Sequence, residues 1–117
     1  MVASIQSNVS ALQAFSKQMA VSANNVANAF SDDFKKSRAI ITEGQNGQVE
    51  TTITKINTPG PLVEDPLSET GELKELSNTD IAEELVNQIM IEQGFKANAK
   101  VIKTYEETIG SIVDLLG

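Results

Sequence analysis

The sequence predicts a mainly α-helical fold: two long terminal helices form an antiparallel, coiled-coil-like pair, with a short β-hairpin and an extended linker in the middle. Two observations lead to this fold class. Apolar or small residues recur at alternating spacings of four and three near both ends of the chain. The middle loses that period and carries β-branched residues, glycines and prolines instead.

The first helix is expected over residues 4–30 and the last over residues 78–116. Alternating spacings of four and three average about 3.5 residues, the period of the contact row in a left-handed coiled coil. We call this row the seam, and we expect it to meet its counterpart within one subunit or between neighbours. The seam residues are Ile5, Val9, Leu12, Met19, Ala23, Val26, Phe30, Phe95, Ala99, Ile102, Ile109, Val113 and Leu116.

The start of the last helix carries capping chemistry. Asp80 is a good N-cap residue, and Glu83 follows three positions later, so the two are expected to form a capping box. Within the helix, Gly94 and Gly110 are each expected to cost about 1 kcal/mol relative to alanine.

The middle of the chain predicts a hairpin followed by a linker. Asn46-Gly47 lies between two β-prone runs, which is a strong signal for a tight hairpin, expected over residues 38–57. Three prolines fall within eight residues further on, so residues 58–76 are expected to form an extended linker. The whole chain, residues 1–117, is then a single domain.

The composition excludes several classes of function. The net charge of −7 argues against nucleic-acid binding, because phosphates are bound by clustered lysine and arginine. The chain has no histidine and no cysteine, which removes imidazole bases and thiol nucleophiles. Pairs of neighbouring acidic residues match no calcium-loop spacing and are better explained as helix caps and solvated faces. The sequence therefore predicts no enzyme, no metal site and no cofactor.

Charge is unevenly distributed along the chain. Eleven acidic residues and two lysines lie between Glu43 and Glu92, a local balance of −9. Lys96, Lys100 and Lys103 share one face of the last helix. This basic face is interpreted as solvated, and the alternative is that it docks against the acidic middle of a neighbouring subunit.

No run of about 18 apolar residues occurs, so no membrane span is expected. The sequence also shows no pattern of a cleavable signal peptide. Export, if it occurs, is expected to use another route.

Motifs at the two ends resemble those of the bacterial flagellar rod and hook proteins, an axial protein family. The first is an Asn-Asn-x-Ala-Asn run at the end of the first helix, followed by Phe-Lys; the second opens the last helix and continues along it. The matched residues are Asn24, Asn25, Ala27, Asn28, Phe34, Lys35, Ser77, Asn78, Asp80, Glu83, Glu84, Ala97 and Asn98.

This resemblance implies a structural subunit of the basal-body rod, assembling through its terminal helices with itself and with other axial proteins. It also implies a place in the periplasmic rod and flagellar type III export without signal cleavage. The short middle is similar to small proximal-rod members. The alternative function is a soluble helical adaptor or export chaperone that binds an amphipathic helix of a partner.

Overall fold

The structure is a computed structural model that describes residues 2–117, with side chains from residue 5 onward. Two helices enclose two small antiparallel hairpins along the sequence, which confirms the mainly helical class with β-structure in the middle. The molecule is elongated, about 81 × 24 × 16 Å. The elements in chain order are α1 (Val2–Ala27), β1 (Ser37–Glu43), the 3-10 turn η1 (Gln45–Gly47), β2 (Val49–Lys55), β3 (Leu62–Glu64), β4 (Leu73–Glu75) and α2 (Ile81–Leu116).

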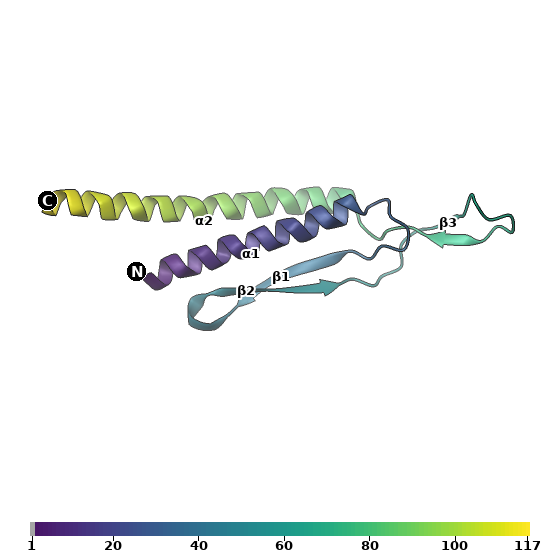
Figure 1. Cartoon of the computed structure of the whole chain (residues 1–117), viewed down its shortest axis with the longest axis horizontal. Helices are drawn as coiled ribbons and strands as arrows, with labels where there is room; N and C mark the ends of the chain where they lie inside the picture. The colour runs from purple at the N-terminus through teal and green to yellow at the C-terminus, as the bar shows by residue number, and fades with distance from the viewer. Residues whose placement is uncertain (1) are drawn as a thin grey trace.

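The helix α1 lies between α2 and the hairpin of β1 and β2 (Figure 1). It runs toward the end of the molecule that carries β3 and β4, and α2 runs away from that end (Figure 1). The last turns of α2 project beyond the start of α1 (Figure 1). The direction of the two helices fits a two-helix pair, and the coiled-coil seam between them stays a prediction.

The helix α1 ends at Ala27, three residues before the predicted end at Phe30. The regular helical bonding stops after Asn28, because the N–H of Ala29 donates to the oxygen of Val26, only three residues back, at 3.1 Å. Turn hydrogen bonds follow, including one from the N–H of Ser31 to the oxygen of Asn28. Phe30 therefore lies outside the helix, with 88% of its surface exposed.

The strands β1 and β2 form the predicted hairpin, bounded by the pairs Ser37 with Lys55 and Glu43 with Val49. Asn46 and Gly47 both have positive φ angles, of 58° and 73°. This backbone conformation is the one that an Asn-Gly hairpin turn requires, because glycine and asparagine tolerate the left-handed region. The structure therefore confirms a hairpin at Asn46-Gly47.

The expected linker over residues 58–76 is not simply extended. The strands β3 and β4 pair within it, with Leu62 opposite Glu75 and Glu64 opposite Leu73. The turn between them is held by Asp65, whose N–H donates to the oxygen of Glu72 at 2.8 Å. The three-residue strands are too short to show a clear alternation in the sequence, and a two-stranded sheet tolerates the nearby prolines at its edge.

The helix α2 begins at Ile81 rather than residue 78, and Asp80 is its N-cap. The Asp80 carboxylate accepts hydrogen bonds from the N–H groups of Ala82 and Glu83. The predicted capping box is incomplete, because the Glu83 side chain pairs instead with Lys36, which directly precedes β1, and with Arg38 on β1. These partners are basic and belong to a neighbouring element, so they draw the carboxylate away from the helix end.

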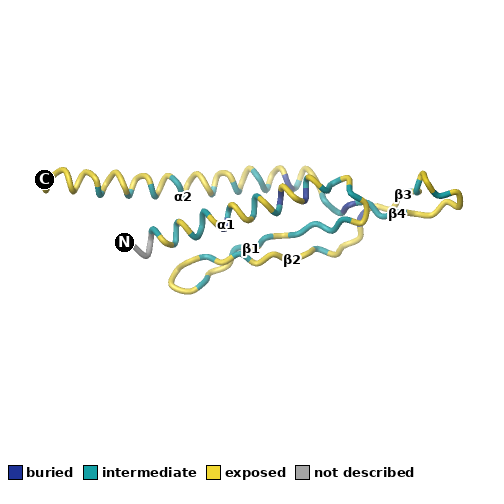
Figure 2. Tube along the Cα trace, in the orientation of Figure 1, coloured by how far each residue is buried: buried dark blue, intermediate teal, exposed yellow. Residues whose placement is uncertain are grey.

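Burial is concentrated where the end of α1 meets the start of α2 (Figure 2). Ala14 is the only apolar residue that is fully buried among the side chains described from residue 5 onward. Among the same described side chains, four polar residues are also buried: Ser22, Asn25, Ser77 and Glu84. The most enclosed part of the subunit is therefore polar, and its apolar surface is largely uncovered.

Candidate functional site

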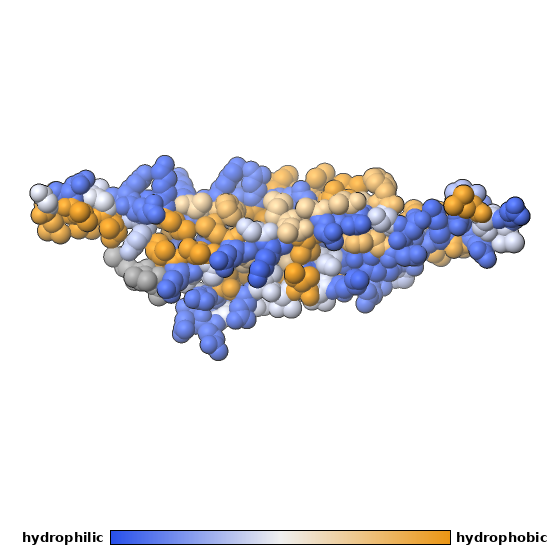
Figure 3. Space-filling view, viewed as in Figure 1, coloured by the Kyte–Doolittle hydropathy of each residue, from blue (hydrophilic) through white to orange (hydrophobic). Residues whose placement is uncertain are grey.

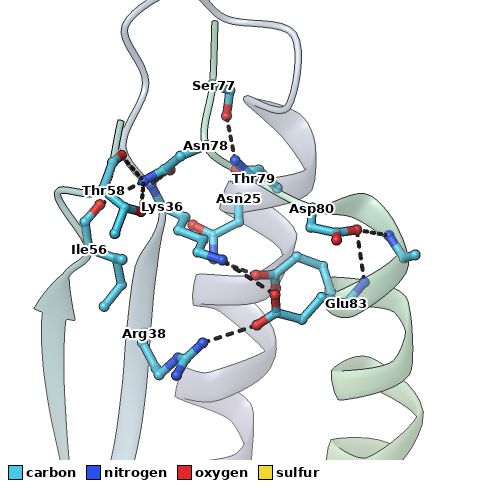
Figure 4. A network of polar contacts seen from close by, with 12 residues as sticks. Asn25, Lys36, Arg38, Ile56, Thr58, Ser77, Asn78, Thr79, Asp80 and Glu83 are labelled. Carbon is cyan, nitrogen blue, oxygen red and sulfur yellow. Dashed lines mark hydrogen bonds and ion pairs between the residues drawn. The ribbon is translucent and has the colours of Figure 1, made fainter. Parts of the chain in front are cut away.

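A cluster of polar contacts joins α1, β1, β2 and the start of α2, and we call it the junction (Figure 4). Asn25 lies at its centre with 1% of its surface exposed. Its Nδ2 atom donates to the backbone oxygen of Ser37 at 2.8 Å, and its Oδ1 atom accepts from the N–H of Ser37 at 2.9 Å. The same Nδ2 atom donates to Glu84 Oε1 at 3.1 Å. One amide therefore links both helices and β1.

Glu84 belongs to the first turn of α2 and is buried. A buried carboxylate is costly unless polar groups face it, and Asn25 supplies a hydrogen bond. The next turn of α2 adds a second link to α1, because Gln88 Nε2 donates to Ser22 Oγ at 3.1 Å. The contact between the two helices is thus made by polar side chains at this end.

Asn78 fixes the base of the first hairpin. Its Oδ1 atom accepts from the N–H of Lys36 at 2.7 Å, and its Nδ2 atom donates to the backbone oxygens of Ile56 and Thr58. Its own N–H donates to the oxygen of Phe34. The side chain therefore bridges the segment before β1 and the segment after β2, and it holds both against the start of α2 (Figure 4).

Ion pairs surround the junction. Lys36 Nζ lies 3.4 Å from Glu83 Oε2, and Arg38 Nη2 lies 3.0 Å from Glu83 Oε1, so one carboxylate of α2 binds two bases near the start of β1. Lys35 binds the Glu75 carboxylate at the end of β4. The Glu83 pairs tie the start of the first hairpin to α2, and the Lys35 pair ties the second hairpin to the segment before β1.

Glu75 has a further donor, the N–H of Gly60 at 2.8 Å. The Lys35 ammonium and then this N–H group lower the pKa of Glu75 below its ordinary value, because both favour the ionised carboxylate. A Cβ atom at Gly60 would lie 2.0 Å from the backbone oxygen of Leu76. Only glycine allows the chain to approach itself this closely here.

About half of the predicted motif residues lie at or beside the junction. Asn25, Lys35, Asn78, Glu83 and Glu84 make the contacts described above, and Ser77 Oγ accepts from the N–H of Thr79. Asn24 and Ala27 are exposed on α1, while Asn28 and Phe34 lie in or beside the turn after it. Ala97 is exposed and Asn98 half-buried further along α2, where Asn98 Nδ2 donates to the oxygen of Gly94.

The predicted seam residues fall into two groups in the structure. One group is half-buried and consists of Ile5, Leu12, Met19, Val26, Ala99, Ile102 and Ile109. The other group is exposed and consists of Val9, Ala23, Phe30, Phe95, Val113 and Leu116. A second row on α1, through Ala14, Ser22 and Asn25, is more buried than the seam.

Phe15 and Gly94 make a close contact between the helices that the sequence did not indicate. A Cβ atom at Gly94 would lie 2.7 Å from Cζ of Phe15, so the glycine leaves space for the ring. Gly94 was expected only to weaken α2. The available signal was a glycine in a helix interior, which often marks a close approach, but it did not name the partner.

Large apolar side chains remain on the outside of α2. Figure 3 shows hydrophobic surface over the first turns of this helix and again at its C-terminal end. Leu85, Val86, Ile89 and Met90 form the first patch. We call residues 110–116 the overhang; it contains the second patch, formed by Ile112, Val113, Leu115 and Leu116.

The polar contacts of the junction hold backbone segments together, and their chemistry is structural. Among the described residues, no group of three or more histidine, cysteine, aspartate or glutamate side chains is arranged to hold a metal ion. Within the described residues 2–117, neither helix is long and apolar enough to cross a membrane.

Comparison with known protein families found two matches, at opposite ends of the chain. Residues 5–35 match the family described as flagella basal body rod protein. Residues 70–115 match the family described as flagellar basal body rod FlgEFG protein C-terminal. A search of curated proteins found no match. The two matched regions contain most of α1 and nearly all of α2, and they meet at the junction.

The fold and the junction define a protein whose two terminal helices are tied together by polar contacts and whose second helix carries exposed apolar patches. Together with the two family matches, they identify its class. The chain belongs to the flagellar basal-body rod proteins, and it is a structural subunit of the basal body of the flagellum. These families are structural rather than enzymatic.

Proposed function

We propose that this rod subunit assembles through its terminal helices, with copies of itself and with other axial proteins of the periplasmic rod. The observation that carries the proposal is the overhang of α2. Its leucines Leu115 and Leu116 are 87% and 85% exposed, although they end a helix whose sequence is amphipathic. Exposed apolar patches of this kind mark protein–protein contacts.

The energetics of the subunit support assembly. Burying one leucine or isoleucine side chain stabilises a complex by about 1.5–3 kcal/mol. With Ala14 as the only fully buried apolar residue among those described, the lone subunit obtains little of this stabilisation. Contacts with neighbours on the overhang and on the first turns of α2 would supply it. A head-to-tail contact of this kind propagates into a helical tube.

The seam has a place in this proposal. The seam residues Leu12, Met19 and Ile102 are half-buried within the subunit. Their exposed neighbours in the same row, such as Val9 and Ala23, would then face the helices of an adjacent subunit. The whole chain, residues 1–117, acts in this proposal as one rod-type domain whose coiled-coil-like contacts form partly within and partly between subunits.

We further propose that the chain has no enzymatic activity and that it is exported without cleavage of a signal peptide. The membership of structural families supports the first point, and the second follows from the resemblance to exported axial proteins. A mass measurement of the subunit isolated from basal bodies tests the second point. An N-terminus that starts at the encoded first residues is expected.

Deletion of the gene tests the proposed function in cells. We expect non-motile cells whose basal bodies lack the rod beyond the missing subunit, as seen by electron microscopy. Complementation with the parent gene restores swimming, and complementation with a gene carrying Leu115→Asp and Leu116→Asp does not. Normal motility and complete basal bodies in the deletion strain would contradict the proposal.

A further inference from the structure

The hairpin of β3 and β4, residues 62–75, projects from the end of the molecule that lies opposite the C-terminus of α2 (Figure 1). We call this hairpin the arm. Its turn is ordered by hydrogen bonds from Asp65 N–H to Glu72 oxygen at 2.8 Å and from Ser68 N–H to Asp65 oxygen at 3.0 Å. Because an isolated two-stranded hairpin is only marginally stable in water, an ordered arm gains from a partner.

The arm combines exposed leucines with negative charge. Leu67 is 90% exposed at its tip, and Leu62 and Leu73 are exposed on its strands. Residues 64–72 contain four acidic residues and neither lysine nor arginine. None of these four carboxylates takes part in an ion pair within the part of the chain that the structure describes. The acidic residues are Glu64, Asp65, Glu69 and Glu72.

A face of α2 has the complementary chemistry. One exposed row along this helix begins with apolar residues and continues with lysines, and we call it the outer face. Its members follow one another at spacings that keep them on one side of a helix. They are Leu85, Ile89, Lys96, Lys100 and Lys103; Glu92 and Glu107 lie on the same side of the helix, so the row carries three positive and two negative charges.

The outer face points away from α1, because α2 turns a different row toward that helix, including Glu84, Gln88 and Gly94. Lys96 and Lys103 form ion pairs with glutamates of the same helix, at 2.6 and 3.9 Å. Such exposed pairs are weak and exchange readily. Lys100 forms none of the ion pairs found among the described residues.

We infer that the arm of one subunit docks on the outer face of α2 in a second copy of the chain. The leucines of the arm cover Leu85 and Ile89, and its carboxylates pair with Lys96, Lys100 and Lys103. The arm projects away from the outer face of its own subunit, so the partner is another molecule (Figure 1). Each subunit then offers one arm and receives one, which produces an open chain of subunits.

This inference rests on the proposed function and adds a specific, charged contact to it. The seam and the overhang are apolar, so their association is largely insensitive to salt. The contact between the arm and the outer face is electrostatic, and salt weakens it because exposed charges are screened. The two kinds of contact are therefore distinguishable by experiment.

Charge reversal of the full-length chain tests the inference. One variant carries Glu69→Lys with Glu72→Lys in the arm, and a second carries Lys100→Glu with Lys103→Glu on the outer face. All four residues are exposed, so circular dichroism should show the parent fold. In sedimentation velocity at low salt, each variant is expected to self-associate about tenfold more weakly than the parent. At high salt this difference should disappear.

A third variant combines all four substitutions and so exchanges the charges of the two surfaces. Its association at low salt is expected to return to the parent level. The matched control carries Glu43→Lys with Glu50→Lys on the other hairpin, which reverses the same amount of charge outside the arm, and it should associate more strongly than the arm variant.

Two results would overturn the inference while the proposed function stands. In the first, the combined variant associates as weakly as the arm variant or the outer-face variant does. In the second, the parent chain remains monomeric at every concentration while deletion of its gene still abolishes motility. This result would mean that a different axial protein, and not a second copy of the chain, covers the outer face. Failure of the proposed function has a different signature, namely normal motility after deletion.

Discussion

The Nδ2 atom of Asn25 lies 3.1 Å from the Oε1 atom of Glu84, and this hydrogen bond joins α1 to α2 across 59 positions of the chain. Both residues are buried, and both belong to the family motifs at opposite ends of the sequence. These motif residues therefore stabilise the contact between the two helices within one subunit. They close the junction between the two helices and the base of the first hairpin (Figure 4).

Replacement of Asn25 by alanine should destabilise the subunit strongly. The substitution removes three hydrogen bonds, two to the Ser37 backbone and one to Glu84, and it leaves a buried carboxylate without this donor. We expect a loss of about 2–4 kcal/mol in the free energy of unfolding. Urea denaturation followed by circular dichroism measures this loss.

Asn24→Ala is the matched control for that experiment. Asn24 is the neighbouring residue of the same type, but its side chain is exposed and contacts only Asn28 in the hydrogen bonds found among the described residues. Its replacement should change the free energy of unfolding by less than about 0.5 kcal/mol. Equal losses for the two variants would show that the junction is not the source of the stability.

The two glycines within α2 should respond differently to alanine. Nothing lies within 4 Å of a Cβ atom at Gly110, so Gly110→Ala should stabilise the helix by about 1 kcal/mol. A Cβ atom at Gly94 would lie 2.7 Å from the Phe15 ring, and moving the ring offsets the gain in helix propensity. Thermal unfolding should therefore give a higher midpoint for Gly110→Ala than for Gly94→Ala. The reverse order would contradict the contact between Phe15 and Gly94.

Acidification should loosen the arm through Glu75. Hydrogen bonds from Lys35 and Gly60 lower the pKa of this carboxyl in the folded chain from the ordinary value of 4.5. Its contribution to stability is present above the ordinary pKa and is lost as the pH falls through the lower folded value. Carbon NMR titration should find the pKa of Glu75 below that of an ordinary glutamate, and Lys35→Met should raise it. A titration unchanged by Lys35→Met would contradict the ion pair.

Local signals in the sequence predicted much of the fold. Asn46-Gly47 predicted the first hairpin because few residues tolerate two successive positive φ angles. The capping role of Asp80 was predicted because an aspartate side chain satisfies free N–H groups at a helix end, although the helix was expected from residue 78. Both features depend on neighbouring residues alone, so a single sequence is sufficient to detect them.

Features that depend on distant partners were not predictable in the same way. Glu83 was assigned to a capping box, but Lys36 and Arg38 bind it instead. The contact of Phe15 with Gly94 requires the register of two helices, which the apolar period alone does not fix. The short strands β3 and β4 were missed because three residues give no readable alternation.

The candidate site was predicted in part. The family resemblance named Asn25, Asn78 and Glu84, but it gave no reason for them to meet. Their meeting point follows from the opposite directions of α1 and α2, which bring the end of one helix to the start of the other (Figure 1). Burial of a polar residue such as Ser22 in place of an apolar one was not expected from the apolar period.

The central claim, assembly through the terminal helices, is tested most directly by light scattering of the purified chain over a range of concentrations. The account predicts that the mass of the parent rises with concentration and that Leu115→Asp with Leu116→Asp keeps the chain monomeric, because each aspartate places an unpaired charge in an apolar contact. Ser111→Asp adds charge to the same overhang at an exposed polar position and should assemble like the parent. If the double aspartate variant assembles as well as the parent, the overhang is not an assembly surface.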